Sequence, residues 1–249
     1  MIPLRDANPT RSTPIVTVAL IVACFVAFAL ELGRLASGGT EALDAFVTEW
    51  GIVPAELTAA WSSGSALTVE TLTLITSQFL HGGWLHLLGN LLFLWIFGNN
   101  VEDRLGRFRF LLFYLVGGAV AGLTQVAIDP ESTIPTIGAS GAIAATLGAY
   151  LVLFPRARIT SLVFLGFFYQ LIDVPAVIVL VFWFALQLID GLTSLGVTDL
   201  SGGVAFFAHI GGFAFGAAVA TIVAAAGRRA SGRAGRGPSA GPSATPAVG

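Results

Sequence analysis

The sequence predicts an all-helical protein that crosses a membrane several times. Of the 249 residues, 55% are hydrophobic and only 10% are charged, whereas a soluble domain carries about 25% charged residues. Apolar runs of roughly 20 residues also recur, and each could cross a hydrocarbon core about 30 Å thick. There are six such runs, which we expect to be membrane spans: residues 14–32, 84–101, 110–128, 140–154, 174–189 and 202–226.

The first span follows a polar segment that contains Arg5 and Arg11, as a cleaved signal peptide would. Its apolar run of 19 residues is longer than the roughly 7–15 residues usual in signal peptides. Because five further spans follow, we interpret it as a retained helix. The chain then divides into a cytoplasmic N-terminal segment (1–13), a membrane domain (14–226) and a tail (227–249) whose Gly, Ala, Pro and Ser content predicts disorder.

Two segments between the spans are less regular. Residues 33–77 form a long outer loop, and Trp50 and Trp61 favour a position partly in the outer membrane interface. Residues 159–173 are apolar but lie between arginines and Pro175, which suits the first turn of a helix. We interpret this second segment as a re-entrant or interfacial stretch on the cytoplasmic side.

The arginines predict the orientation of the chain. All twelve basic residues are arginine, and with six crossings eleven of them fall on one side of the membrane, whereas Arg34 falls on the other. Arginine-rich loops stay in the cytoplasm, so we expect both termini to be cytoplasmic. Acidic residues gather on the side of Arg34: Glu41, Asp44, Glu49, Glu56, Glu70, Asp129, Glu131, Asp190 and Asp199.

A few polar side chains lie within the spans, where they are costly and therefore indicate function. His86 and Asn90 are in the outer third of the second span, Ser140 begins the fourth, and His209 lies about two turns into the sixth. The fourth span has only about 15 residues and is shorter than a full crossing. Ser140 should therefore lie below the outer surface, at the same depth as the other three side chains.

Small residues predict that the fourth and sixth spans pack closely. They recur four positions apart, which lets helix backbones approach in lipid: Gly141 and Ala145, Ala144 and Gly148, and Gly212 and Gly216. Ser140 and His209 could then come within hydrogen-bond reach, as a serine nucleophile and its general base require. His86 and Asn90, on one helical face, could donate to a developing oxyanion, and the Ser140 backbone N–H could add a third donor.

Other interpretations explain less of this pattern. A lone serine in a span is usually bonded to its own helix, but that does not account for four polar groups at one depth. Three histidines suggest zinc, yet no H-E-x-x-H motif or flanking carboxylate occurs within a span, so we expect no metal and no cofactor. A small-molecule transporter would need an internal repeat and charge at the membrane midplane, and the sequence shows neither. Cys24 has no partner for a disulfide within the chain, and we find no nucleic-acid motif.

Together these residues resemble the rhomboid family of intramembrane serine proteases. The resemblance covers about residues 70–220 and rests on Gly-x-Ser-Gly at 138–141, "HLLGN" at 86–90 and "AHIGGFAFG" around His209. The run "FGNNVEDRLGRFRFLLFYL" adds the family's Glu-x-x-x-Gly pattern at Glu102 and Gly106. The stretches "IPLRDANP" and "WGIVPAEL" are also similar to bacterial members, which implies a place in the inner (cell) membrane of a bacterium.

The resemblance implies a six-helix bundle with a long outer loop between helices 1 and 2, and a Ser–His dyad without an acidic third member. Ser140 would be the nucleophile and His209 the general base, with His86 and Asn90 in the oxyanion hole. His81 falls where some members have a structural histidine. The implied substrates are single-span membrane proteins, cut near their outer ends in the lipid bilayer. The alternative is a catalytically inactive relative that binds membrane clients, although loss of the serine or histidine would mark it and both are present.

Overall fold

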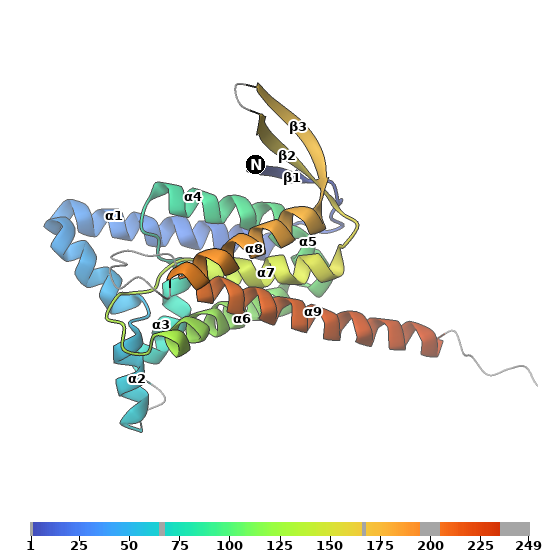
Figure 1. Cartoon of the computed structure of the whole chain (residues 1–249). Coiled ribbons are helices and arrows are strands. Elements are labelled where there is room, and N and C mark those ends of the chain that lie inside the picture. Colours follow the sequence, from blue (N-terminus) through green and yellow to red (C-terminus); the bar gives the residue numbers. More distant parts are fainter. Residues whose placement is uncertain (1, 65–67, 166–167, 195–204, 235–249) are drawn as a thin grey trace, which may run out of the picture.

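The computed structural model describes residues 2–64, 68–165, 168–194 and 205–234. Figure 1 shows a bundle of helices that run roughly side by side, with a small sheet projecting from one end. Among the described helices, three are long and apolar enough to cross a membrane: α1 (Ile15–Trp50), α6 (Arg107–Ile128) and α9 (Phe206–Ala234).

Further apolar helices complete the bundle. Val69–Phe79 and Trp84–Leu105, bent by 81°, would make a fourth span if they act as one, and α7 (Ser140–Leu153) and α8 (Ala176–Ser194) are shorter. The prediction of a helical, polytopic membrane fold is therefore confirmed, and length and composition support three or four spans among the described residues. α9 continues to Ala234, beyond the predicted end of the last span at 226, and residues 235–249 lie outside the described residues.

Residues 33–77, expected as a long outer loop, are mostly helical. α1 continues to Trp50 through a kink where Gly38 and Gly39 leave helical geometry, Gly39 with a φ of +68°. The helix resumes because apolar residues return at helical spacing beyond the kink: Leu43, Phe46, Val47 and Trp50. Two more helices follow in the described part of this segment, α2 (Pro54–Ser62) and α3 (Val69–Thr76).

The start of α1 is held by Glu102. Pro14 precedes the helix and offers no side-chain cap. Instead, the buried Glu102 carboxylate accepts hydrogen bonds from the N–H groups of Val16 (3.0 Å) and Thr17 (2.7 Å) and from the Thr17 hydroxyl (2.8 Å). A carboxylate here satisfies free N–H groups and matches the positive end of the helix dipole. These hydrogen bonds join α1 to a continuous helical segment that consists of α4 (Trp84–Phe93), a π-helical stretch (Leu94–Gly98) and α5 (Asn99–Leu105).

α7 lies inside the bundle and packs mainly against α9 and α6. Every residue from Gly141 to Tyr150 is buried. The helix backbones touch where glycines occur: a Cβ added at Gly212 would lie 2.2 Å from the Gly141 carbonyl oxygen, and one at Gly216 would lie 1.8 Å from that of Ala145. Larger side chains would push α7 and α9 apart, so the predicted close packing of these two helices is confirmed.

A three-stranded antiparallel sheet stands where a re-entrant or interfacial stretch was expected. β2 (Arg158–Leu165) and β3 (Phe168–Pro175) form a hairpin, and β1 (Ile2–Asp6) pairs with the other edge of β2. The re-entrant interpretation of residues 159–173 was wrong because this segment pairs with the opposite end of the chain, which no local pattern reveals. Its interfacial position stays a prediction.

Asp6 fastens the sheet to the bundle. Its carboxylate accepts hydrogen bonds from the Tyr150 hydroxyl (2.5 Å), from the Asn100 side chain (2.6 Å) and from the Asn8 backbone N–H. Burial raises the pKa of Asp6 above its ordinary value of 3.8. These bonds join β1 to α5 and α7.

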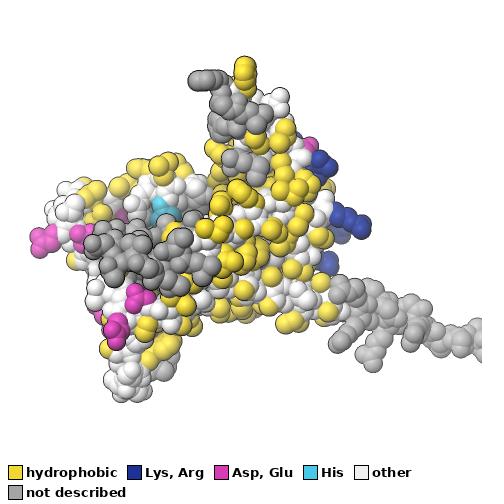
Figure 2. Space-filling model, viewed as in Figure 1, with side chains coloured by type: hydrophobic (Ala, Val, Ile, Leu, Met, Phe, Trp, Pro, Cys, Tyr) yellow, Lys and Arg dark blue, Asp and Glu magenta, His cyan; other side chains and the backbone are white. Residues whose placement is uncertain are grey.

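Charged side chains separate towards the two ends of the molecule. Figure 2 shows the visible arginines at one end, most of the visible carboxylates at the other, and a broad hydrophobic surface between them. Such a surface is expected of a protein surrounded by lipid. The fold therefore belongs to an integral membrane protein.

Candidate active site

Ser140 begins α7, next to a tight turn at Gly138. Gly138 has a φ of +126°, which L side chains rarely adopt, and its N–H donates to the Ser77 carbonyl oxygen (2.9 Å). A Cβ at this position would lie 2.8 Å from His86 Nε2 and 3.5 Å from Ser140 Oγ. Glycine therefore allows the chain to turn into α7 and leaves room for both polar side chains.

The Ser140 hydroxyl is hydrogen-bonded to His209. Ser140 Oγ lies 2.7 Å from His209 Nε2, although the residues are 69 positions apart in the chain. His209 lies near the start of α9 and is only 7% exposed. About one turn further along α9, Gly212 touches the α7 backbone. The close helix contact that requires glycine thus also brings the imidazole to the serine.

His86 lies on the other side of Gly138, on α4. Its Nδ1 accepts a hydrogen bond from the Gly82 N–H (3.3 Å), so in the neutral ring the proton is on Nε2. Nε2 is the atom nearest the Gly138 position, which directs an N–H donor towards the turn before Ser140. The His86 ring also packs edge-on against His81, with centroids 5.2 Å apart.

Asn90 follows His86 by one turn of α4 and is buried. Its side-chain nitrogen has no hydrogen-bond partner in the described part of the chain. The Asn90 amide is therefore available to donate to a bound group, and such a bond would remove the cost of leaving a buried amide unpaired. The structure thus joins Ser140 and His209 directly and sets His86 beside them, but gives no hydrogen bond from Asn90 to Ser140 among the described residues.

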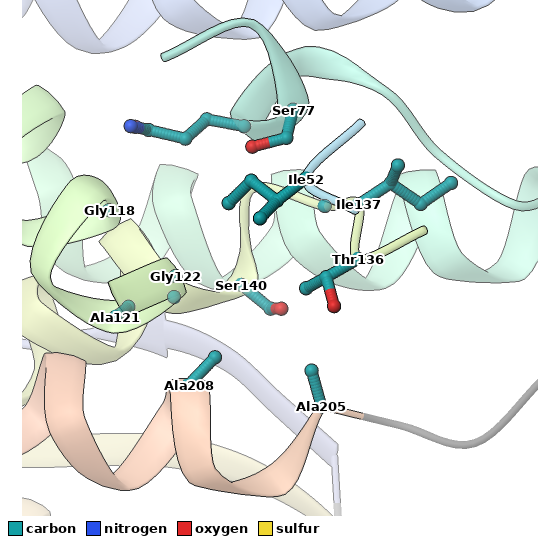
Figure 3. A pocket seen from close by; sticks show the side chains of 13 residues that line it. Ile52, Ser77, Gly118, Ala121, Gly122, Thr136, Ile137, Ser140, Ala205 and Ala208 are labelled. Carbon is teal, nitrogen blue, oxygen red and sulfur yellow. The ribbon is translucent and has the colours of Figure 1, made fainter. Parts of the chain in front are cut away.

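A small cavity of about 20 Å³ lies beside Ser140. Figure 3 shows the Ser140 side chain pointing into the space between Thr136 and Ile52 on one side and Ala205 and Ala208 on the other. Small side chains dominate the walls, and the space beside the hydroxyl is large enough for a water molecule. Further lining residues come from α6 and from the segments before α4 and α7: Ser77, Gln78, Gly118, Ala121, Gly122, Ile137 and Gly138.

A family model described as the rhomboid domain matches residues 68–226. The match covers more than half of the chain and includes all four candidate residues, Ser140, His209, His86 and Asn90. The chain belongs to the rhomboid family.

Named relatives are similar to parts of this rhomboid chain. Over 135 residues it is 39% identical to the Rhomboid protease GluP of Bacillus subtilis, covering 54% of this chain and 25% of the relative. Over 161 residues it is 27% identical to the Presenilin-associated rhomboid-like protein A, mitochondrial, of Danio rerio, covering 63% and 38%. Over 69 residues it is 42% identical to the Rhomboid-like protein 11, chloroplastic, of Arabidopsis thaliana, covering 28% and 24%. The chain thus spans less than half the length of these relatives.

Besides the residues that line the cavity, Gln187 and Glu31 contribute polar side chains near this rhomboid site and were not among the sequence candidates. Gln187 on α8 brings Oε1 to 2.5 Å from His209 Nδ1. Glu31 on α1 accepts the backbone N–H of His81 with both carboxylate oxygens (3.0 and 3.3 Å), which holds the chain before α4. Both residues lie inside predicted spans near their outer ends, so the cost of polar groups in lipid was a signal for them as well.

The histidines do not gather into a metal centre. Within the ranges that the structure describes, no group of three His, Cys, Asp or Glu side chains could hold a metal ion. His81 Nδ1 lies 3.0 Å from the Phe79 carbonyl oxygen, to which it can donate. That this rhomboid domain needs no metal or cofactor stays a prediction.

Proposed function

We propose that this rhomboid chain is an intramembrane serine endopeptidase, which hydrolyses peptide bonds in or near the transmembrane segments of membrane proteins. The observation that carries the proposal is the 2.7 Å hydrogen bond between Ser140 Oγ and His209 Nε2. A hydroxyl bonded to an imidazole nitrogen is the arrangement that activates a serine nucleophile. The likeness to a relative named Rhomboid protease GluP adds support.

The proposed reaction has two proton-transfer cycles. His209 Nε2 takes the Ser140 proton while Oγ bonds to the carbonyl carbon of the scissile peptide. The C–N bond then breaks, Nε2 passes the proton to the leaving amine, and the acyl group remains on Oγ. Water attacks next, gives a proton to Nε2 and displaces the Ser140 oxygen, which regains the proton. The products are a carboxylic acid and an amine, with water as the only co-reactant.

His86, Asn90 and the Ser140 backbone N–H are proposed to stabilise the oxyanion of each step. His86 directs Nε2–H towards the turn at Gly138, and the Asn90 amide is a buried donor without a partner among the described residues. Preorganised donors of this kind act on charge that develops in the transition state. We expect His86→Ala or Asn90→Ala to lower kcat by about 100-fold to 1000-fold.

In this proposal the short helices α7 and α8 complete six crossings. α7 has 14 residues and is about 21 Å long, so its first residue lies below the surface of a hydrocarbon core about 30 Å thick. Ser140 would then meet water from the outer side and a single-span substrate from the bilayer. We place the chain in a bacterial inner membrane. Both termini would lie in the cytoplasm, because loops rich in arginine stay on that side and Figure 2 shows the visible arginines at one end of the molecule.

The test is a cleavage assay in liposomes with a generic single-span substrate. The wild-type chain should cut, and a fluorophosphonate probe should label Ser140. Ser140→Ala and His209→Ala should each lose at least about 1000-fold in rate. Leu186→Ala is the folded control, because this side chain is exposed on α8.

The proposal fails if a broad substrate panel is never cut and the probe never labels Ser140 in folded protein. The chain would then be a rhomboid relative that binds membrane clients without cutting them. In that case capture of a single-span client should survive Ser140→Ala.

A further inference from the structure

His209 is hydrogen-bonded at both ring nitrogens. Its Nε2 lies 2.7 Å from Ser140 Oγ, and its Nδ1 lies 2.5 Å from Gln187 Oε1. The three side chains come from α7, α9 and α8, and Gln187 is half-buried. The imidazole is therefore tied to a helix on each side of it.

The partner at Nδ1 decides which ring nitrogen carries the proton. An amide oxygen can only accept a hydrogen bond, so Nδ1 is the donor, and the neutral ring keeps its lone pair on Nε2. A lone pair that faces the Ser140 hydroxyl is what a general base needs. In the opposite tautomer Nε2–H would face Ser140, and the ring could not take the proton.

Aromatic side chains on α8 hold the same ring. Trp183, one turn before Gln187, packs against the His209 ring with centroids 5.9 Å apart and against the Phe213 ring at 6.2 Å. Phe184 stacks on Phe213 at 4.6 Å. Because α8 and α9 are packed together around His209, the Gln187 amide is presented from a supported position.

We propose that Gln187 is a positioning residue that fixes the tautomer and orientation of His209. The inference rests on the proposed function of Ser140 and His209. Gln187 takes the place of the carboxylate in a Ser-His-Asp triad, where the third residue orients the imidazole. A neutral amide suits a site within a membrane, because a carboxylate in this place would be more costly.

The first test removes the acceptor and keeps the length of the side chain. Gln187→Met should lower kcat by about 10-fold to 100-fold, because the base is no longer held in its productive orientation. KM should stay close to the wild-type value, since Gln187 acts through His209. Leu186→Ala, a neighbouring change on the exposed surface of α8, should alter neither constant. Equal kcat for Gln187→Met and wild type would overturn the inference.

Gln187→Glu separates positioning from packing. Its carboxylate accepts the same hydrogen bond and should restore most of the rate lost in Gln187→Met. It also stabilises the protonated imidazole, which cannot act as a base, so the acid limb of the kcat/KM profile should move to higher pH. His86 on α4, the other imidazole beside the site, is the same in every variant. An acid limb that does not move would contradict the inference.

A spectroscopic test does not depend on catalysis. The chain has three histidines, so NMR of the imidazole nitrogens in detergent is tractable, and His209→Ala identifies the His209 signals. Wild type should show the Nδ1–H tautomer at His209, and Gln187→Met should show a mixture. The Nε2–H tautomer in wild type would overturn the inference whether or not the chain cuts substrates. Nδ1–H in a chain that cuts nothing would uphold the contact and remove only the proposed activity.

Discussion

At the scale of single residues, Gly138 lets the polar groups of the site meet. An alanine there would need a φ of +126°, and its Cβ would lie 2.8 Å from His86 Nε2. We therefore expect Gly138→Ala to slow fluorophosphonate labelling of Ser140 by about 100-fold, because His86 and the turn must both shift. Gly89→Ala on α4, where nothing lies within 4 Å of the added Cβ, is the control. Equal labelling rates in the two variants would show that Gly138 has no such role.

The sequence could bring some residues of the site together and not others. Ser140 and His209 could be paired because polar residues in the spans are few and because glycines mark the helix faces that touch. Gln187 could not, since its role depends on how α8 is rotated about its axis, and an almost uniformly apolar helix carries no sign of that rotation. The contact between His209 and Gln187 therefore appears only in three dimensions.

At the scale of elements, the contact between α7 and α9 depends on Gly216. A Cβ there would lie 1.8 Å from the Ala145 carbonyl oxygen, a backbone atom that cannot move without its helix. Gly216→Ala should lower the free energy of unfolding in detergent by about 1–3 kcal/mol and slow cleavage, because His209 is carried by the same helix. Gly33→Ala in α1, with no atom within 4 Å of the new Cβ, should not lower it. Similar unfolding midpoints for both variants would show that the close approach of α7 and α9 at Gly216 does not stabilise the fold.

The hydrogen bonds between Glu102 and the start of α1 lead to a second prediction at this scale. Glu102→Gln turns an amide N–H₂ towards N–H groups that need acceptors and removes a charge that matches the helix dipole. The free energy of unfolding should fall by about 1–3 kcal/mol, measured as a lower midpoint of thermal unfolding. Asp103→Asn is the matched control, because Asp103 accepts exposed hydrogen bonds from the Ser12 hydroxyl (2.6 Å) and the Arg11 backbone N–H (3.2 Å), which water can replace. If Asp103→Asn lowered the free energy of unfolding more than Glu102→Gln, Glu102 would not be the carboxylate that holds the start of α1.

The elements that the sequence could not predict are those that depend on distant partners. Apolar residues occur on both faces of β2, for example Leu162 on one and Val163 on the other, so the hairpin of β2 and β3 lacks the alternation that identifies a half-buried strand. Its third strand, β1, lies at the other end of the chain. Helices need only local hydrogen bonds, which is why the starts of α4 and α7 could be predicted from the apolar runs alone.

At the scale of the whole molecule, arginine placement and the apolar surface together predict how the chain sits in a membrane. The predicted count of six spans came from the number of apolar runs and the side on which arginines fall. The described helices differ in length, however, and α7 is short because Pro155 follows it closely and bars further helix. A short central helix is what lowers Ser140 beneath the outer surface in the proposed arrangement.

Cysteine labelling in intact bacterial cells tests this orientation. Cys24 is fully buried, and Cys24→Ala removes it as a background. In that background Ser62→Cys, at the exposed end of α2, should react with a membrane-impermeant maleimide, because the acidic end of the bundle is predicted to face outwards. Ala7→Cys, exposed after β1 at the arginine-rich end, should react only after the cells are permeabilised. The reverse pattern would mean that the chain is inserted in the opposite orientation, with the Ser140 cavity on the cytoplasmic side. Labelling of both sites in intact cells would require an even number of crossings between them, which contradicts the single crossing by α1.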